Sequence, residues 1–146
     1  MSIKENKGLV SRLLKENRVV PEGVAKIDAL MEKYYDPKYV WHIPSGDLDF
    51  EQCKKIVREI WAAFPDASYS IDDIVGEGDR VVVRYTMKGT HKGTFRGIAA
   101  TGKKFTQAGI GIYRTGGGKL LECWMINDSL GLMQQLGAIP SAPTKK

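Results

Sequence analysis

The stretch RVVVRYTMKGTH at residues 80–91 alternates apolar and polar side chains along most of its length. A period of two is typical of a β-strand with one buried and one exposed face. The face that carries Val81, Val83 and Tyr85 is predicted to point inward. His91 continues that face at the strand's end, where it lies either at a pocket mouth or as a hydrogen-bonded histidine beside a turn.

Two further strands are predicted downstream, at residues 104–114 and 119–127. The segment Thr115-Gly116-Gly117-Gly118 between them predicts a hairpin. A strand is also expected at residues 69–75, so the second half of the chain forms a run of antiparallel strands.

The first half of the chain is predicted to be mainly helical. Apolar residues recur at helical spacing over residues 3–19 and 24–34. Asp49 and Gln52 have capping-box spacing at the start of a third helix that runs to about Phe64. A short strand at 39–43 and a last helix at 129–136 complete the list.

This order of elements predicts one α+β domain over residues 1–146, with frayed ends at 1–6 and 138–146. A bent antiparallel sheet around the N-terminal helices would enclose a pocket. The 146 residues contain 42% hydrophobic and 27% charged residues, which is ordinary for a globular domain.

Composition argues against several classes of protein. No apolar run approaches the roughly 18 residues of a membrane span, and a cytoplasmic protein is expected. The net charge of +5 is scattered among acidic residues, so no nucleic-acid partner is expected. Neither the two cysteines nor the two histidines have zinc-site spacing, and we expect no metal and no organic cofactor.

The segment 104–114 has glycines on its inner face, at Gly109 and Gly111. They either enlarge the pocket or let the sheet bend. The opposite, convex face carries Ile110 and Ile112, joined by Trp124, and is too apolar for a monomer. We expect a homodimer that packs through this face.

Several short motifs, in their order and spacing, resemble the SnoaL-like (polyketide cyclase-like, NTF2-like) family, sometimes called ester cyclases. These motifs are Phe64-Pro65-Asp66, Gly76-Glu77-Gly78-Asp79-Arg80, Gly89-Thr90-His91-Lys92-Gly93, Thr101-Gly102-Lys103, Gly118-Lys119-Leu120, Glu122-Cys123-Trp124 with Asp128, and Gln135-Leu136-Gly137. The resemblance implies an NTF2-like cone, a dimer and an apolar cavity.

The resemblance also implies a type of chemistry. Polyketide cyclases of the family close a ring by an aldol reaction in which a buried Asp removes a proton next to a carbonyl. Alignment of the motifs places Met125 at the position of this Asp, and Gly109 and Gly111 at the positions of a Gln and a His. None of the three can transfer a proton.

We therefore expect the site to use other residues. His42 is the first candidate for an acid–base group, with a buried structural histidine as the alternative. Asp128 is a second candidate base, although its place before the last helix favours a capping role. The predicted ligand-binding residues are Trp41, Trp61, Tyr85, His91, Gln107, Gly109, Gly111, Tyr113, Met125 and Asn127.

Three functions remain open at this stage, and the third and weakest is a dimeric interaction module whose cavity is incidental. The first is a cofactor-independent enzyme that performs acid–base chemistry, of cyclase, isomerase or lyase type, on a small apolar carbonyl compound. The second is a dimeric protein that binds or carries such a molecule without catalysis. A pocket in which His42 has no polar partner would favour binding.

Overall fold

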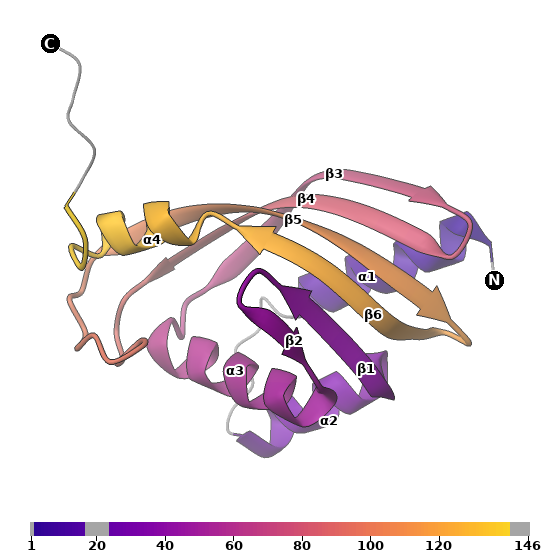
Figure 1. Ribbon diagram of the computed structural model, residues 1–146, viewed down its shortest axis with the longest axis horizontal. Coiled ribbons are helices and arrows are strands. Elements are labelled where there is room, and N and C mark those ends of the chain that lie inside the picture. Colours follow the sequence, from indigo (N-terminus) through magenta and orange to yellow (C-terminus); the bar gives the residue numbers. More distant parts are fainter. Residues whose placement is uncertain (1, 17–23, 141–146) are drawn as a thin grey trace, which may run out of the picture.

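The computed structural model describes residues 2–16 and 24–140. Over these residues the chain forms four helices and one six-stranded sheet (Figure 1). The helices are α1 (Ile3–Glu16), α2 (Val24–Tyr34), α3 (Phe50–Ala63) and α4 (Ser129–Gln135). The strands are β1 (Tyr35–Ile43), β2 (Gly46–Leu48), β3 (Ser68–Glu77), β4 (Arg80–Thr90), β5 (Lys104–Gly116) and β6 (Lys119–Asn127).

The strands lie in the order β2-β1-β6-β5-β4-β3. Neighbouring strands are antiparallel except β1 and β6, which run parallel. The expectation of a purely antiparallel sheet is wrong at this one pairing. No tight turn connects β1 to β6, so their connection does not force an antiparallel arrangement.

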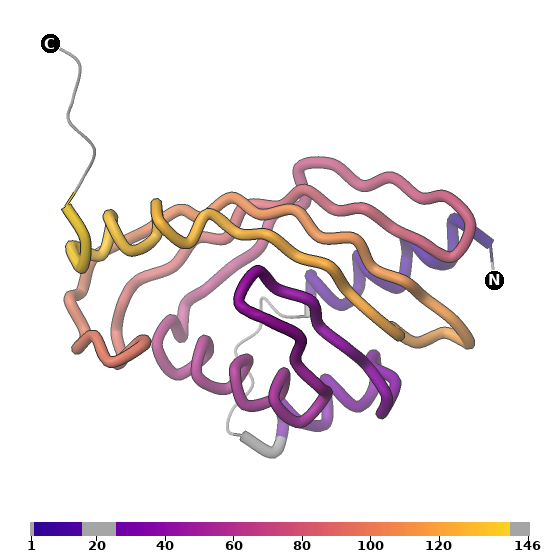
Figure 2. The backbone as a smooth tube through the Cα atoms, in the orientation of Figure 1, coloured from indigo at the N-terminus to yellow at the C-terminus, as the bar shows by residue number. Residues whose placement is uncertain are grey.

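The sheet is curved and its concave face is covered by helices (Figures 1 and 2). Helix α1 packs against β3 and β4, and α3 packs against β1. Helix α4 lies at the end of the sheet away from α1, in contact with β5 (Figure 1). The hydrophobic core therefore sits between the concave face of the sheet and the helices, as the sequence predicts.

The alternating pattern of the central strands is confirmed. In β4 the side chains of Val81, Val83, Tyr85 and Met87 are buried, and their neighbours are exposed or half-buried. In β5 the inner face holds the residues Phe105, Gln107, Gly109, Gly111 and Tyr113. One face of the sheet thus belongs to the core and the other faces outward.

Helix α3 begins where its cap predicts. The Asp49 carboxylate accepts a hydrogen bond from the Gln52 backbone N–H at 2.9 Å, and the Gln52 side chain accepts one from the Asp49 N–H at 2.9 Å. This reciprocal capping box satisfies two backbone donors that the helix itself cannot.

Several element boundaries differ from the sequence prediction. β1 begins at Tyr35 rather than Tyr39, and the short strand β2 pairs with it in an unpredicted hairpin. Ile3–Asn6, expected to fray, forms the first turn of α1, where Asn6 is only 3% exposed. Residues 17–19 and 141–146, predicted as helix end and frayed tail, lie outside the described residues. None of the helices in the described ranges is long and apolar enough to cross a membrane.

Candidate functional site

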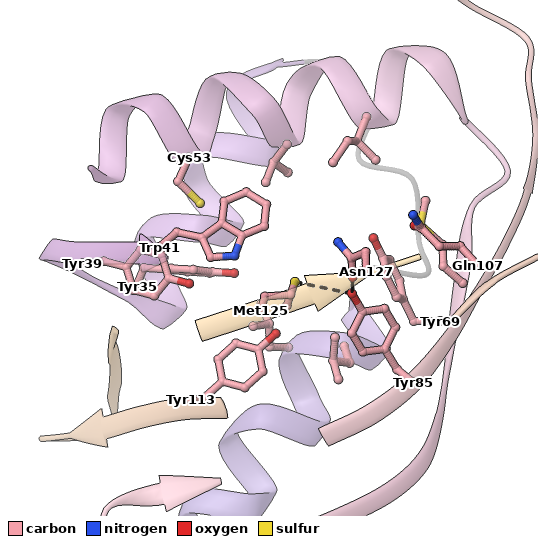
Figure 3. Close-up of a pocket in the computed structure, with 15 residues that line it drawn as sticks. Tyr35, Tyr39, Trp41, Cys53, Tyr69, Tyr85, Gln107, Tyr113, Met125 and Asn127 are labelled. Atoms are coloured by element: carbon pink, nitrogen blue, oxygen red, sulfur yellow. Dashed lines mark hydrogen bonds between the residues drawn. The ribbon is translucent and has the colours of Figure 1, made fainter. Parts of the chain in front are cut away.

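A cavity of about 100 Å³ lies between the helices and the inner face of the sheet (Figure 3). Helices α1 and α3 form one wall, and strands β1, β3, β4, β5 and β6 form the other. Its lining residues are Leu13, Leu14, Tyr35, Tyr39, Trp41, Cys53, Val57, Ile60, Tyr69, Tyr85, Met87, Gln107, Tyr113, Met125 and Asn127. Apolar side chains thus dominate a wall that also carries hydroxyl, amide and indole groups.

Five tyrosines line this cavity: Tyr35, Tyr39, Tyr69, Tyr85 and Tyr113. Burial raises the pKa of Tyr69 to about 12 and holds the pKa values of the other four well above 10. Removal of the hydroxyls from water disfavours the charged phenolate. The tyrosines therefore remain neutral hydrogen-bonding groups at any physiological pH.

Tyr85 and Asn127 form a hydrogen-bonded pair on the cavity wall. The Tyr85 hydroxyl donates to Asn127 Oδ1 and lies 3.4 Å from Met125 Sδ. Gly109 lies between them on β5, opposite Tyr85 on β4 and Asn127 on β6. A Cβ atom on Gly109 would sit 2.4 Å from Asn127 Oδ1 and 2.5 Å from Tyr85 Oη. Only glycine leaves the room this pair needs.

Gly111 and Met125 also face inward. A Cβ on Gly111 would meet Met125 Cε at 3.2 Å, which is close but involves a flexible side chain. Met125 lines the cavity directly, whereas the two glycines pack against its wall residues. The inward orientation expected for Gly109, Gly111 and Met125 is therefore the one observed.

Carboxylates and imidazoles are absent from the described cavity lining. Its polar groups are the five phenols, the Trp41 indole, the amides of Gln107 and Asn127, and the Cys53 thiol. Burial raises the pKa of Cys53 to about 12, so the thiol stays protonated. These groups can donate and accept hydrogen bonds but none is a base near neutral pH.

His42 lies on the convex face of the sheet, and the prediction that it lines the cavity is wrong. Its neighbour Trp41 pairs with Cys123 on the inner face, so His42 and its partner Trp124 point outward. The imidazole stacks on Trp124 with ring centres 5.0 Å apart. Its Nδ1 lies 2.7 Å from Asp47 and its Nε2 lies 2.5 Å from Glu122.

These carboxylates set the charge of His42. The hydrogen bonds to Glu122 and Asp47 raise the pKa of His42 above its usual value near 6.5. The hydrogen bond from His42, together with that from Arg114 at 2.9 Å, lowers the pKa of Glu122. The cluster is a half-exposed ion-pair network on the outer surface.

The His42 cluster predicts a pH-dependent contribution to stability. A raised folded pKa stabilises the protein fully below the unfolded pKa of about 6.5, and the stabilisation is lost as pH rises through the folded value. Substitution His42→Phe keeps a ring on Trp124 but removes the titration. We expect the stability advantage of wild type over this variant, below about 1 kcal/mol, to be larger at about pH 5.5 than at about pH 8.5. Urea unfolding at a fixed protein concentration measures it, and parallel pH profiles would contradict it.

His91 and Trp61 do not line the cavity either. His91 is 0% exposed and packs beside Phe64, with ring centres 5.8 Å apart. Its Nδ1 lies 3.0 Å from Thr101 Oγ1 and accepts from the Thr101 N–H at 3.3 Å. Trp61 is a buried core residue on α3. Both residues therefore pack in the core and do not contact the cavity. His91 is the hydrogen-bonded histidine that the sequence analysis gave as the alternative to a pocket residue.

Asp128 caps α4, as the sequence favours. Its carboxylate accepts a hydrogen bond from the Gly131 N–H at 2.9 Å. The residue is exposed and belongs to the rim of the convex face rather than to the cavity. A base in that position would act on the outside of the sheet.

The convex face is hollowed into a wide apolar groove of about 880 Å³. Ile110, Ile112, Trp124 and Ile126 form its floor, because Ile110 pairs with Ile126 and Ile112 with Trp124. Ile110 is 50% exposed and Ile126 is 68% exposed. The predicted outward orientation of this apolar set is confirmed.

Comparison with known proteins agrees with this architecture. A model of the SnoaL-like polyketide cyclase family matches residues 25–136, which is more than half of the chain. This chain belongs to the SnoaL-like polyketide cyclase family. The α+β, NTF2-like fold class is confirmed, with a curved sheet that does not close.

Solved structures of similar proteins cover nearly the whole chain. AclR, a proposed hydroxylase from Streptomyces galilaeus, has a TM-score of 0.84 at 26% identity, covering 97% of this chain and 87% of AclR. A proposed polyketide cyclase from Acidithiobacillus ferrooxidans has a TM-score of 0.77 at 33% identity, covering 94% and 99%. IdmH from Streptomyces antibioticus, also a proposed polyketide cyclase, has a TM-score of 0.76 at 25% identity, covering 90% and 98%. No functionally curated protein matches the sequence.

In this SnoaL-like protein, six of the predicted ligand-binding residues line the cavity: Trp41, Tyr85, Gln107, Tyr113, Met125 and Asn127. Sequence analysis missed Tyr35, Tyr39 and Tyr69. Tyr39 shares the odd-numbered face of Trp41 within the predicted strand 39–43, and a strand extended back to residue 35 would also have placed Tyr35 on that face. Pro37 argued against that extension, because proline donates no ladder hydrogen bond.

Within residues 2–16 and 24–140, no group of three or more His, Cys, Asp or Glu side chains could hold a metal ion.

Proposed function

We propose that this chain binds a small, largely apolar molecule with a carbonyl group in the cavity between α3 and the sheet. The observation that carries the proposal is the composition of the wall, in which neutral donors and acceptors interrupt an apolar surface. Pockets of this composition use the apolar area for affinity and the few polar groups for orientation. A carbonyl oxygen is the acceptor that such donors bind without a charged partner.

The size of the cavity limits the ligand. Its volume is about 100 Å³. Apolar cavities of about 150 Å³ take up one benzene ring, and pockets for drug-sized molecules span about 300–1,000 Å³. The ligand we propose is therefore no larger than a single small ring or a short branched chain, and molecules with several fused rings are too large.

Binding without catalysis accounts best for the missing base. The polyketide cyclase reaction implied by the family needs a buried carboxylate, and Met125 stands at that position. His42, the sequence-based alternative, lies outside the cavity next to Asp47 and Glu122. With only neutral groups around it, a bound ketone would be oriented but not deprotonated.

A cofactor-independent enzyme is the second candidate, and membership of the cyclase family favours it. In that case hydrogen bonds from the cavity wall would stabilise an enolate oxygen as it forms. The proton would have to leave to water or to another group of the substrate. The two candidates differ in one readout: a bound ligand is recovered unchanged from a binding protein and converted by an enzyme.

A thermal-shift series graded by ring number tests the proposal. We expect cyclohexanone at about ten times its Kd to raise the melting temperature by a few degrees, because it stabilises only the folded state. Anthrone, a ketone with three fused rings, should cause no shift. Mass spectrometry of the recovered cyclohexanone then separates binding from turnover. If no single-ring ketone raises the melting temperature, the proposal is wrong.

We further propose that two copies of the chain associate through the convex groove. Large exposed apolar patches are uncommon on monomers, and Ile110 and Ile126 are both at least half exposed. The rim charges are already paired within one chain: Arg84 with Asp73 at 2.6 Å and His42 with Glu122 at 2.5 Å. A second copy can therefore approach without opposing like charges, despite the net charge of +5.

A further inference from the structure

The Asn127 amide directs its oxygen toward its neighbour Tyr85. Because the Tyr85 hydroxyl donates to Asn127 Oδ1, the Nδ2 end of the amide is turned away from Tyr85. Figure 3 shows this nitrogen on the side of the cavity that faces α3. Within the described part of the chain, Nδ2 takes part in no hydrogen bond. Asn127 therefore presents a free amide donor on the cavity wall.

This orientation depends on three adjacent strands. Tyr85 on β4 and Asn127 on β6 meet across the bare backbone of Gly109 on β5. Any side chain at Gly109 would come within 2.5 Å of both polar groups and would separate them. The free donor is thus fixed by the sheet and not by a mobile loop.

Gln107 presents the opposite polarity on the same face of β5. Its Nε2 donates to the backbone oxygen of Asp128 at 3.3 Å. A backbone carbonyl can only accept, so this contact fixes the amide orientation and leaves Oε1 as the free end. Gln107 is only 7% exposed, and within the described residues no hydrogen bond to its Oε1 is observed.

The two amides are close enough to bind one small molecule. Asn127 lies opposite Gly109, so Gln107 and Asn127 are diagonal neighbours on the inner face. Diagonal positions of an antiparallel pair are about 7–8 Å apart at the backbone. Two amide side chains that extend from such positions can reach neighbouring groups of a single ring.

We propose that Asn127 Nδ2 binds the carbonyl oxygen of the ligand and that Gln107 Oε1 accepts a hydrogen bond from a hydroxyl or N–H on the adjoining atom. The ligand class is therefore a small α-hydroxy ketone or a lactam. Tyr85 acts in this proposal as a positioning residue, since its hydroxyl contacts the Asn127 amide oxygen. This inference rests on the proposed function and names the chemistry that the same cavity selects.

Three probes with the same six-membered ring test the assignment by NMR titration of the full chain. Methylenecyclohexane offers no polar group, cyclohexanone offers an acceptor, and 2-hydroxycyclohexanone offers an acceptor and a donor. We expect affinity to rise by about two- to tenfold at each step, as one neutral hydrogen bond is added. The Asn127 side-chain amide signals should shift with both ketones and stay in place with the hydrocarbon.

Three variants test which residue causes each increase in probe affinity. Asn127→Leu should abolish the preference for cyclohexanone over the hydrocarbon, and Gln107→Met should abolish only the preference for the added hydroxyl. Tyr85→Phe should weaken ketone binding but leave hydrocarbon binding unchanged. Tyr34→Phe, which removes a buried hydroxyl outside the cavity, is the matched control and should change none of the ratios.

The outcomes separate the two proposals. If no probe binds wild type, the proposed function fails and this assignment fails with it. If all three bind equally and the amide signals do not move, the cavity is a binding site but the roles of Asn127 and Gln107 are wrong. The wild-type amide shifts decide between these outcomes even if a variant does not fold.

Discussion

Val57→Phe is expected to abolish ligand binding while the fold is kept. Val57 lies on α3 and its side chain lines the cavity. The larger phenyl ring would occupy much of the roughly 100 Å³ that a ligand needs. We expect more than a tenfold loss of affinity for every ring probe, and a change in unfolding free energy within about 1.5 kcal/mol, because the ring fills existing space. Titration calorimetry and urea unfolding measure the two quantities.

Lys55→Phe is the matched control for this prediction. It introduces the same side chain on the exposed surface of the same helix. Probe affinity should remain that of wild type. Wild-type affinity in the Val57→Phe variant would show that ligands bind elsewhere, for example in the convex groove.

Ile110→Asp is expected to convert the proposed dimer into a monomer. Ile110 lies on the floor of the convex groove, on β5, and half of its surface is exposed. A carboxylate at the centre of an apolar interface would have to lose its hydration without a partner, which costs several kcal/mol. Light scattering should give twice the 16.2 kDa chain mass for wild type and the single chain mass for the variant.

Val75→Asp serves as the control for the interface. Val75 is 57% exposed on the same sheet, but it lies on the edge strand β3 and outside the groove. This variant should keep the wild-type mass. Wild-type protein that behaves as a monomer at all concentrations would refute the dimer.

Much of the fold follows from periodicity in the sequence. The alternation at 80–91 and 104–114 identifies the inner face correctly, and Asp49 with Gln52 marks the start of α3. The pairing of β1 with β6 could not be predicted, because no local pattern encodes a parallel contact between strands that far apart in sequence. The hairpin of β1 and β2 was missed because β2 has only three residues.

The candidate site shows where sequence reasoning needs geometry. Trp41 and His42 are adjacent on one strand, so they point to opposite faces and cannot both line one pocket. The structure places Trp41 inside and His42 outside. The role of Gly109 also needed coordinates, since its contacts come from Tyr85 and Asn127 on two other strands.

Family membership suggests cyclase chemistry, whereas the described cavity lining lacks the base that this chemistry needs. The chain belongs to a family of polyketide cyclases, yet the lining residues in the described chain include no carboxylate and no imidazole. Neutral phenols and amides are suited to hold an oxygen in place. Under the proposed function, the site is a selective binding cavity on the fold of this family.

A crystal structure of wild-type protein soaked with cyclohexanone is the most direct test of a binding site inside the sheet. The account predicts electron density for the ring among Trp41, Val57 and Tyr113, with its oxygen within hydrogen-bonding distance of Asn127 Nδ2. Density only on the outer floor formed by Ile110 and Trp124, or an inner cavity that stays empty at saturating ketone, would contradict it.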